Sequence, residues 1–369
     1  MEDIEMKEKC LSICKDFLGG AWLKVTMDDF VFSMITGGLS NHLYMCALPN
    51  HILPHSDNSN VPPKVLVRIY GQIIHEDPET VVIDSVVFTS LAEKGLGPKL
   101  YGVFTGGRVE QYVNSRHLYT EELAIPSISS ECAKIMASFH KLNMPLVKKP
   151  KWLFETITRY LDEVLNNVSF DSEQIENTAK LERLLSLGLA KEETELKSIL
   201  LQVHSPVVFC HNDMQEGNIL FIENSDEPDD WKLKAIDFEY SSYNYRAYDI
   251  ANHFVEWCYD YSHAEHPYYL ADISKYPTKK QQYHFFRHYL AEMEDENINF
   301  DRELDNLYKE VAAFTLASHF FWGLWSIVQA HVATINFSYL DYALIRFEHY
   351  FKQKKDALMI LKSDNNTCD

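Results

Sequence analysis

The segment VFCHNDMQEGNIL, residues 208–220, places polar side chains directly after a short apolar run. Asp213 and Asn218 lie within it, and a further acid, Asp237, follows in AIDFEY. Phosphoryl transfer from ATP requires these residue types, because one acid orients the attacking hydroxyl while an amide oxygen and a second carboxylate bind Mg²⁺. The sequence therefore predicts a phosphotransfer site with Asp213 as the base and with Asn218 and Asp237 as the metal ligands.

The alternative is that these are turn residues at the end of a strand, where Asp and Asn are common. The spacing of Asp213 and Asn218 equals that of the HRDxxxxN loop of protein kinases, which is a weak signal alone. A simple turn rarely needs six polar residues, so the catalytic interpretation is favoured. His211 is expected to support the loop through hydrogen bonds, whereas the contacts of Gln215 and Glu216 stay open.

The N-terminal third carries candidates for binding a nucleotide. Small residues let backbone N–H groups approach phosphates, so TGGLSN predicts a phosphate loop of Gly37, Gly38, Leu39, Ser40 and Asn41, although the glycines also suit an ordinary hairpin. Arg68, in the middle of VLVRIYG, is either a phosphate-binding cation with Asp84 as its acidic partner or a solvent-facing strand residue. The residues predicted to contact adenine are Gln111, Tyr112 and Val113.

The elements that must position these residues fall into two groups. Period-two patterns and glycine turns predict strands at 36–48, 65–71, 97–113, 207–210, 219–222 and 233–238. Apolar residues at helical spacing predict helices at 78–95 and 127–143 and two or three within 151–203. We therefore expect an α+β, bilobal fold, with a small antiparallel-sheet lobe over residues 1–113 and a larger, mainly helical lobe over 114–369.

The charge and the cysteine content limit the kinds of partner and the compartment that we expect for this chain. Its 369 residues carry 34 Lys and Arg against 54 Asp and Glu, a net charge of −20, which opposes binding to nucleic acid or to anionic membranes. Seven cysteines are scattered without a CxxC pair, and the first ten residues are polar. These features predict reduced thiols and a cytoplasmic protein.

The segment 311–337 contains no Asp, Glu, Lys or Arg and is long enough to span a bilayer. It also contains Thr315, Ser318, His319, Gln329 and His331, and its strongly apolar part is too short to span. We expect a helix buried within the protein and no membrane span.

Most of the chain resembles the choline/ethanolamine kinase family, and its choline kinases in particular. The matching segments are GPKLYGVF at 97–104, EQYVNSRHL at 110–118, VFCHNDMQEGNIL at 208–220, IDFEYSSYNYRAYDIANHFVEWCYDY at 236–261, YPTKKQQ at 276–282, LASHFFWGLWSIVQA at 316–330 and DYALIRFEHYF at 341–351. The stretches 49–64 and 160–205 are the least alike. Asp-Phe-Glu stands where protein kinases have Asp-Phe-Gly, so no phosphorylation-controlled activation loop is expected.

The resemblance implies a protein-kinase-like fold and transfer of the γ-phosphoryl group of ATP to the hydroxyl of choline with Mg²⁺, the first step of phosphatidylcholine synthesis. By this resemblance, Asp213 is the catalytic base, and Asn218 and Asp237 are the metal ligands. It makes Asp249, in YDIANHF, a structural acid that ties the catalytic region together. It also implies a homodimer.

A quaternary ammonium cannot donate a hydrogen bond, so it must be held by aromatic faces and a negative charge. Trp322 and Trp325 are three residues apart and share a helix face. In the resemblance the choline pocket is lined by Tyr240, Glu256, Tyr261, Trp322, Trp325 and Tyr342, with Glu256 as the counter-charge. From the residues alone, such an aromatic stripe is more often simply core, as we expect for Trp257 and Tyr259.

Other functions compete with this one. An ethanolamine kinase would bind a primary ammonium, for which carboxylates matter more than aromatic rings. A non-catalytic scaffold with a kinase fold is disfavoured by the intact trio Asp213, Asn218 and Asp237. An antibiotic kinase would need many acids for a polycation, and a protein kinase normally carries Asp-Phe-Gly.

Overall fold

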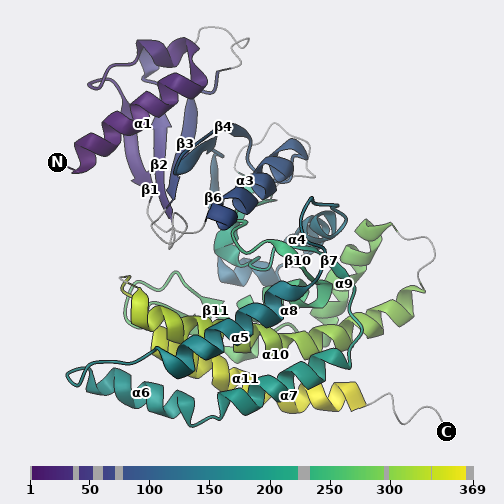
Figure 1. Cartoon of the computed structure of the whole chain (residues 1–369). Helices are drawn as coiled ribbons and strands as arrows, with labels where there is room; N and C mark the ends of the chain where they lie inside the picture. Colours follow the sequence, from purple (N-terminus) through teal and green to yellow (C-terminus); the bar gives the residue numbers. More distant parts are fainter. Residues whose placement is uncertain are drawn as a thin grey trace. The chain divides into compact units, whose positions relative to one another are not determined.

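The computed structural model describes residues 2–35, 41–52, 61–70, 78–222, 233–294, 299–333 and 335–362. The chain divides into two compact units (Figure 1). The first contains Met1–Arg116 and Ile222–Glu239, and the second contains His117–Phe221 and Tyr240–Asp369. The Asp-Phe-Glu segment therefore belongs to the first unit, although it lies far along the sequence.

A five-stranded antiparallel sheet forms the first unit. Its order is β1 (Val31–Ile35), β2 (Asn41–Ala47), β3 (Lys64–Tyr70), β5 (Gly107–Gln111) and β4 (Leu100–Phe104). Helix α1 (Glu2–Leu18) packs against β2 and β4, and α3 (Pro78–Glu93) packs against β4. The predicted strand at 65–71, helix at 78–95 and hairpin at 97–113 are confirmed. Strand β9 (Leu233–Ala235) lies in the Asp-Phe-Glu segment.

Three charged side chains, Arg68, Arg108 and Glu110, are buried together in this sheet. Arg68 and Arg108 are direct cross-strand neighbours, an arrangement of like charges that is unfavourable alone. The Glu110 carboxylate offsets this repulsion, because it accepts a hydrogen bond from Arg68 Nε at 3.3 Å and another from Arg108 Nε at 2.9 Å. Burial opposes ionisation of Glu110, but the two arginines lower its pKa below the ordinary value. Arg68 therefore pairs with Glu110, and not with Asp84 as expected, because Arg108 takes Asp84.

The second unit is mainly helical. Its helices are α4 (Pro126–His140), α5 (Lys151–Asn166), α6 (Ile175–Leu185), α7 (Leu189–Leu201), α8 (Arg246–Glu256), α9 (Lys279–Met293), α10 (Phe300–Val332) and α11 (Tyr339–Lys362). Strands β7 (Val207–Cys210) and β10 (Ser242–Tyr245) form an antiparallel pair, with Cys210 opposite Ser242. The strand at 242–245 was not expected, although Tyr243 and Tyr245 alternate with polar residues as in a short strand. Short strands β11 (Tyr259–Asp260) and β12 (Leu270–Ala271) also belong to the second unit, whereas β6 (Ser115–His117) and β8 (Ile219–Ile222) contain the residues at which the chain passes from one unit to the other.

Helix α10 contains most of the charge-free segment and packs against α5, α8 and α11. Within the described ranges it is the helix whose length and apolar composition would suffice to cross a membrane, yet 83% of that apolar window is buried in the protein. Asn299 caps its start by accepting from Arg302 N at 3.1 Å, and Glu303 and Glu310 near that end bind Arg246. The predicted buried helix is confirmed, beginning eleven residues earlier and ending at Val332.

Replacing Glu110 by Gln should destabilise the first unit by about 3 kcal/mol or more, because it removes the shared acid from two buried arginines. The exposed Glu93 on α3 offers a matched control, and Glu93→Gln should change stability by less than about 0.5 kcal/mol. Urea unfolding followed by circular dichroism measures both. Equal midpoints for the two variants would contradict the assigned role of Glu110.

Candidate active site

The loop after β7 brings Asp213 and Asn218 into direct contact. Asn218 Nδ2 donates to the carbonyl of Asp213 at 2.9 Å and to its Oδ2 at 2.8 Å. Asp213 N donates to His211 Nδ1 at 3.3 Å, so His211 supports the loop as predicted. Asn212 has a φ of 67°, a left-handed conformation that Asn tolerates better than most residues. This kink turns the chain from the strand into the loop.

The amide of Asn218 is oriented by these contacts. Its NH₂ group is used on Asp213, which leaves Oδ1 as the amide atom suited to a cation. Mg²⁺ prefers oxygen ligands and needs only one or two from the protein beside phosphate and water. The donor set of Asn218 therefore fits the predicted metal.

Asp249 on α8 holds this loop. Its Oδ1 accepts from Asn212 N at 2.7 Å, and its Oδ2 accepts from His211 N at 2.9 Å and from His140 Nε2 at 3.0 Å. Burial alone would raise the pKa of Asp249, but the hydrogen bonds from His140 and His211 lower it below its ordinary value. The Asp249 carboxylate is thus a structural acid that holds the loop in its ionised form, as predicted.

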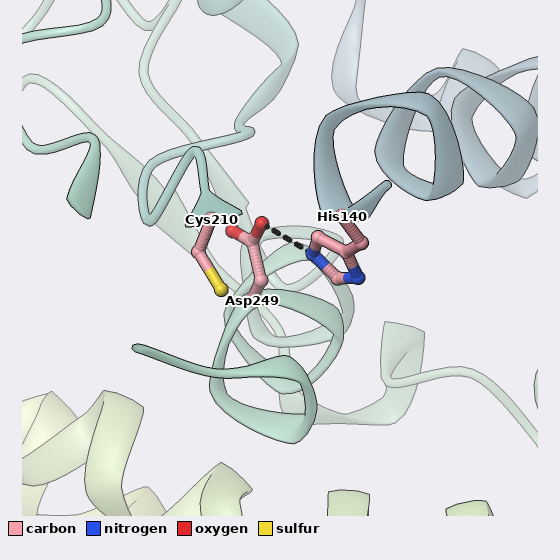
Figure 2. Close-up of side chains that lie close together, drawn as sticks. All are labelled: His140, Cys210 and Asp249. Atoms are coloured by element: carbon pink, nitrogen blue, oxygen red, sulfur yellow. Dashed lines mark hydrogen bonds and ion pairs between the residues drawn. The ribbon is translucent and has the colours of Figure 1, made fainter. Parts of the chain in front are cut away.

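Figure 2 shows His140, Cys210 and Asp249 side by side, with ligand-type atoms that all lie within 4.8 Å of one another. All three are buried, and the second nitrogen of His140 contacts Tyr289 Oη at 2.8 Å. Burial raises the pKa of Cys210 well above its ordinary value, so the thiol stays protonated and donates to Asn244 O at 3.6 Å. Because their polar atoms are engaged, this trio is a structural cluster and a poor metal site.

The structure gives contacts for Gln215 and Glu216, which sequence reasoning left open. Gln215 caps a short 3₁₀ turn, because its Oε1 accepts from Gly217 N at 2.7 Å. Glu216 accepts from Thr120 Oγ1 at 3.1 Å, while its buried Oε2 has no hydrogen-bond partner among the described residues. Burial, followed by the charge of Glu256, raises the pKa of Glu216 to about 8.

Three of the predicted cage residues form one aromatic cluster in the second unit. The rings of Tyr240 and Trp322 lie 5.4 Å apart at 73°, and those of Trp322 and Trp325 lie 5.3 Å apart at 78°. Edge-to-face packing of this kind fixes the orientation of each ring. Trp325 continues the cluster to Tyr339 at 5.9 Å, a residue that sequence reasoning missed.

The other three predicted cage residues form a polar cluster around a buried arginine. Glu256 Oε2 accepts from Tyr261 Oη at 2.7 Å, and Tyr261 and Tyr342 share a 2.5 Å hydrogen bond. Arg346 forms an ion pair with Glu256 Oε1 and donates through Nε to Tyr342 Oη at 2.8 Å. Both oxygens of Glu256 are therefore engaged, and its charge is balanced within the protein by a residue that was not predicted.

The polar residues of α8 lie on one face of the helix. Asp249, Asn252, His253 and Glu256 follow the spacing i, i+3, i+4 and i+7, and all four are buried. Asn252 donates to Asn212 O at 3.2 Å, and His253 Nδ1 contacts Met214 O at 2.8 Å. A polar stripe inside an otherwise apolar helix is the signal that could have identified Asn252 and His253.

The nucleotide-binding candidates belong to the first unit. Gly37, Gly38, Leu39 and Ser40 lie outside the described residues. Asn41 begins β2, Gln111 ends β5, and Tyr112 and Val113 follow it. Gln111 Oε1 accepts from Lys99 N at 3.1 Å, and the Lys64 ammonium lies 3.6 Å from the Tyr112 ring centre. Within the described ranges, Arg68 donates a hydrogen bond only through Nε, to Glu110. The N–H groups on its two Nη atoms therefore remain available as donors to a ligand.

Asp237 follows β9 with a φ of 62°. A non-glycine residue in this region is strained, and such strain is commonest at functional sites. Phe238 fixes the segment by packing its ring 6.1 Å from that of Phe88 on α3. A Cβ on Gly97 would lie only 3.1 Å from the Phe238 ring, so the close approach favours glycine there.

Comparison with known proteins identifies relatives over most of the chain. The family model described as choline/ethanolamine kinase matches residues 32–351. A choline kinase alpha of Mus musculus is 47% identical, with 93% of this chain and 79% of the relative aligned. A choline/ethanolamine kinase of Homo sapiens is also 47% identical, over 92% of this chain and 84% of the relative.

A solved structure extends the likeness to the fold. The choline kinase of Cryptosporidium parvum superposes with a TM-score of 0.72 at 30% identity, covering 95% of this chain and 96% of that one. Its likeness confirms the predicted α+β, protein-kinase-like fold class.

His253 should make the second unit less stable in acid. Burial lowers its pKa from 6.5 to about 4, so the unfolded chain binds a proton that the folded chain refuses. Stability should therefore fall as the pH drops from 6.5 towards 4, by up to about 3 kcal/mol for this one group. Calorimetric melting temperatures at pH 7.5, 6.0 and 5.0 measure the loss.

The matched variants are His253→Asn, which can still donate to Met214 O, and the exposed His51→Asn. The first should lose part of the pH dependence of the melting temperature, and the second should retain it. An unchanged pH dependence in His253→Asn would show that this histidine already titrates normally in the folded protein.

Proposed function

The chain belongs to the choline/ethanolamine kinase family, and from that premise we propose that it transfers the γ-phosphoryl group of ATP to the hydroxyl of choline. Family membership assigns it the phosphorylation of choline or ethanolamine. The choice of choline and the residue roles below form the proposal. The product, phosphocholine, would enter phosphatidylcholine synthesis.

One observation carries the proposal. In the second unit, the Asp213–Asn218 pair and the aromatic cluster are joined through buried hydrogen bonds, because Asn252 contacts both Asn212 O and Trp322 Nε1. A catalytic acid next to aromatic faces suits an acceptor that has a hydroxyl at one end and a cation at the other. This pairing supports choline as the acceptor better than a sugar or a protein side chain.

In the proposed reaction, the Asp213 carboxylate accepts the proton of the choline hydroxyl as the hydroxyl oxygen attacks the γ-phosphorus, while the bond from that phosphorus to the β-phosphate oxygen breaks and ADP leaves. The 2.8 Å hydrogen bond from Asn218 Nδ2 holds that carboxylate in place. Asn218 Oδ1 and Asp237 would hold Mg²⁺, which when bound neutralises charge on the phosphate oxygens. The Nη groups of Arg68 offer a planar pair of donors to a phosphate.

The remaining nucleotide contacts follow the sequence prediction. We assign phosphate contacts to Gly37, Gly38, Leu39, Ser40 and Asn41, and adenine contacts to Gln111, Tyr112 and Val113. The first unit would then bind the nucleotide, and the second would bind choline. A cytoplasmic homodimer is the expected state, and light scattering that gives the mass of two chains would support it.

The preference for choline rests on how charge is distributed in the second unit. A primary ammonium needs hydrogen-bond acceptors, whereas a quaternary ammonium needs aromatic faces. The Glu256 carboxylate already accepts from Arg346 and Tyr261, while Tyr240, Trp322 and Trp325 present aromatic rings. These contacts favour a cation that donates no hydrogen bond.

Asp213→Asn should lower kcat for choline by roughly 10²–10⁴-fold, the usual contribution of a positioned base. A coupled assay of ADP release, with phosphocholine quantified separately, provides the measurement. Asp162→Asn, an exposed acid on α5, should keep wild-type turnover. Full activity in Asp213→Asn would remove the base role from this residue. ATP binding without phosphocholine in the wild type would favour the scaffold function.

Acceptor choice needs a separate experiment, because the name of the human relative includes both substrates. Choline and ethanolamine at equal concentration should give mainly phosphocholine, with the higher kcat/KM for choline. A higher kcat/KM for ethanolamine would replace choline as the preferred acceptor and leave the kinase assignment intact.

A further inference from the structure

We propose that Asn252 is a positioning residue that fixes the aromatic cluster relative to the catalytic loop. This inference rests on the proposed function, because it assumes that Trp322 faces the cation and that Asp213 faces the hydroxyl. Asn252 would set the distance between the end of the acceptor site that holds the cation and the end that holds the hydroxyl. Asn252 itself would not touch the substrate.

The amide of Asn252 makes contacts in two directions. Its Nδ2 donates to the carbonyl of Asn212 at 3.2 Å. Its Oδ1 accepts from Trp322 Nε1 at 2.7 Å and from Ser318 Oγ at 2.7 Å. Asn252 and Ser318 are fully buried. Only a side chain that donates on one side and accepts on the other can join these groups.

The carbonyl that Asn252 binds belongs to the peptide bond leading into Asp213. The same Asn212 residue donates through its side-chain Nδ2 to Tyr240 O at 2.8 Å and to Ser242 Oγ at 2.8 Å. Trp322 and Tyr240 have their rings in edge-to-face contact. Both aromatic residues are therefore tied to the residue that precedes the proposed base.

This arrangement has a consequence for catalysis. An acceptor held by its cation presents its hydroxyl to Asp213 only if the indole and the loop keep a fixed separation. A misplacement of about 1 Å can lower a rate by about 10²-fold. The Asn252 amide supplies a rigid link over this distance, because it is fully buried and both its donor and its acceptor are engaged.

The test is a double-mutant cycle on kcat/KM for choline. Asn252→Asp keeps the acceptor for Trp322 but loses the donor to Asn212, and Trp322→Phe keeps an aromatic ring but loses the indole N–H. Each single variant should lower kcat/KM by about 10-fold or more. The fall in kcat/KM of the double variant should be at least about 5-fold smaller than the two single-variant falls multiplied together, because each change breaks the same link.

Two further readouts separate positioning from general damage. Asn252→Asp should lower kcat more than it raises KM for choline, whereas Trp322→Phe should mainly raise KM. Ser318→Ala removes the other donor to Asn252 Oδ1 and should change kcat/KM for choline by less than about 3-fold, since the Ser318 hydroxyl donates to Asn252 and not to the loop or to an aromatic residue of the cluster. KM for ATP should stay near the wild-type value in all variants.

Additive effects in the cycle, or equal losses in Ser318→Ala and Trp322→Phe, would overturn the role of Asn252. If Asn252→Asp does not fold, Asn252→Ser enters the same cycle with the same expected coupling. The premise is checked independently by the wild type. Wild-type protein that fails to phosphorylate choline refutes the proposed function, whereas an active wild type with additive variants refutes only the positioning role.

Discussion

The buried carboxylate of Asp249 is the interaction on which the catalytic loop depends. It accepts from the backbone N–H groups of His211 and Asn212 and from the His140 side chain. A loop that leaves a strand through a left-handed residue has unpaired donors, and burying them without an acceptor would be costly. Asp249 satisfies two adjacent donors with one charged group, so the position of Asp213 follows from the position of α8.

Helix α8 then connects the loop to its surroundings through one polar face. Asn252 reaches Asn212 and Trp322, His253 reaches Met214, and Glu256 reaches Tyr261. Helical geometry places such residues in a single row. The loop, the aromatic cluster and the polar cluster around Arg346 are therefore all held by one rigid helix. This is how a site on a loop can keep a precise geometry.

Buried charge is handled in the same way in both units. Glu110 is shared by Arg68 and Arg108 in the first, and Glu256 is paired with Arg346 in the second. An isolated buried carboxylate would be neutralised by protonation, so each acid needs its cation to remain charged. For Glu256 this changes the chemistry of the proposed acceptor site, because aromatic faces carry more of the attraction for a cation when the nearby acid is already balanced.

The sequence alone predicted the α+β fold class, the strands at 65–71 and 97–113, helices α3 to α7 and α10, and the five-residue spacing that lets Asn218 reach Asp213, because these depend on local patterns. It also predicted the structural role of Asp249 through resemblance. Only the tertiary structure decided that Glu110 pairs with Arg68, that Arg346 neutralises Glu256 and that Asn252 joins the loop to Trp322. Those contacts link residues 40 to 90 positions apart. Which distant polar groups share a buried space is set by packing, which no local pattern encodes.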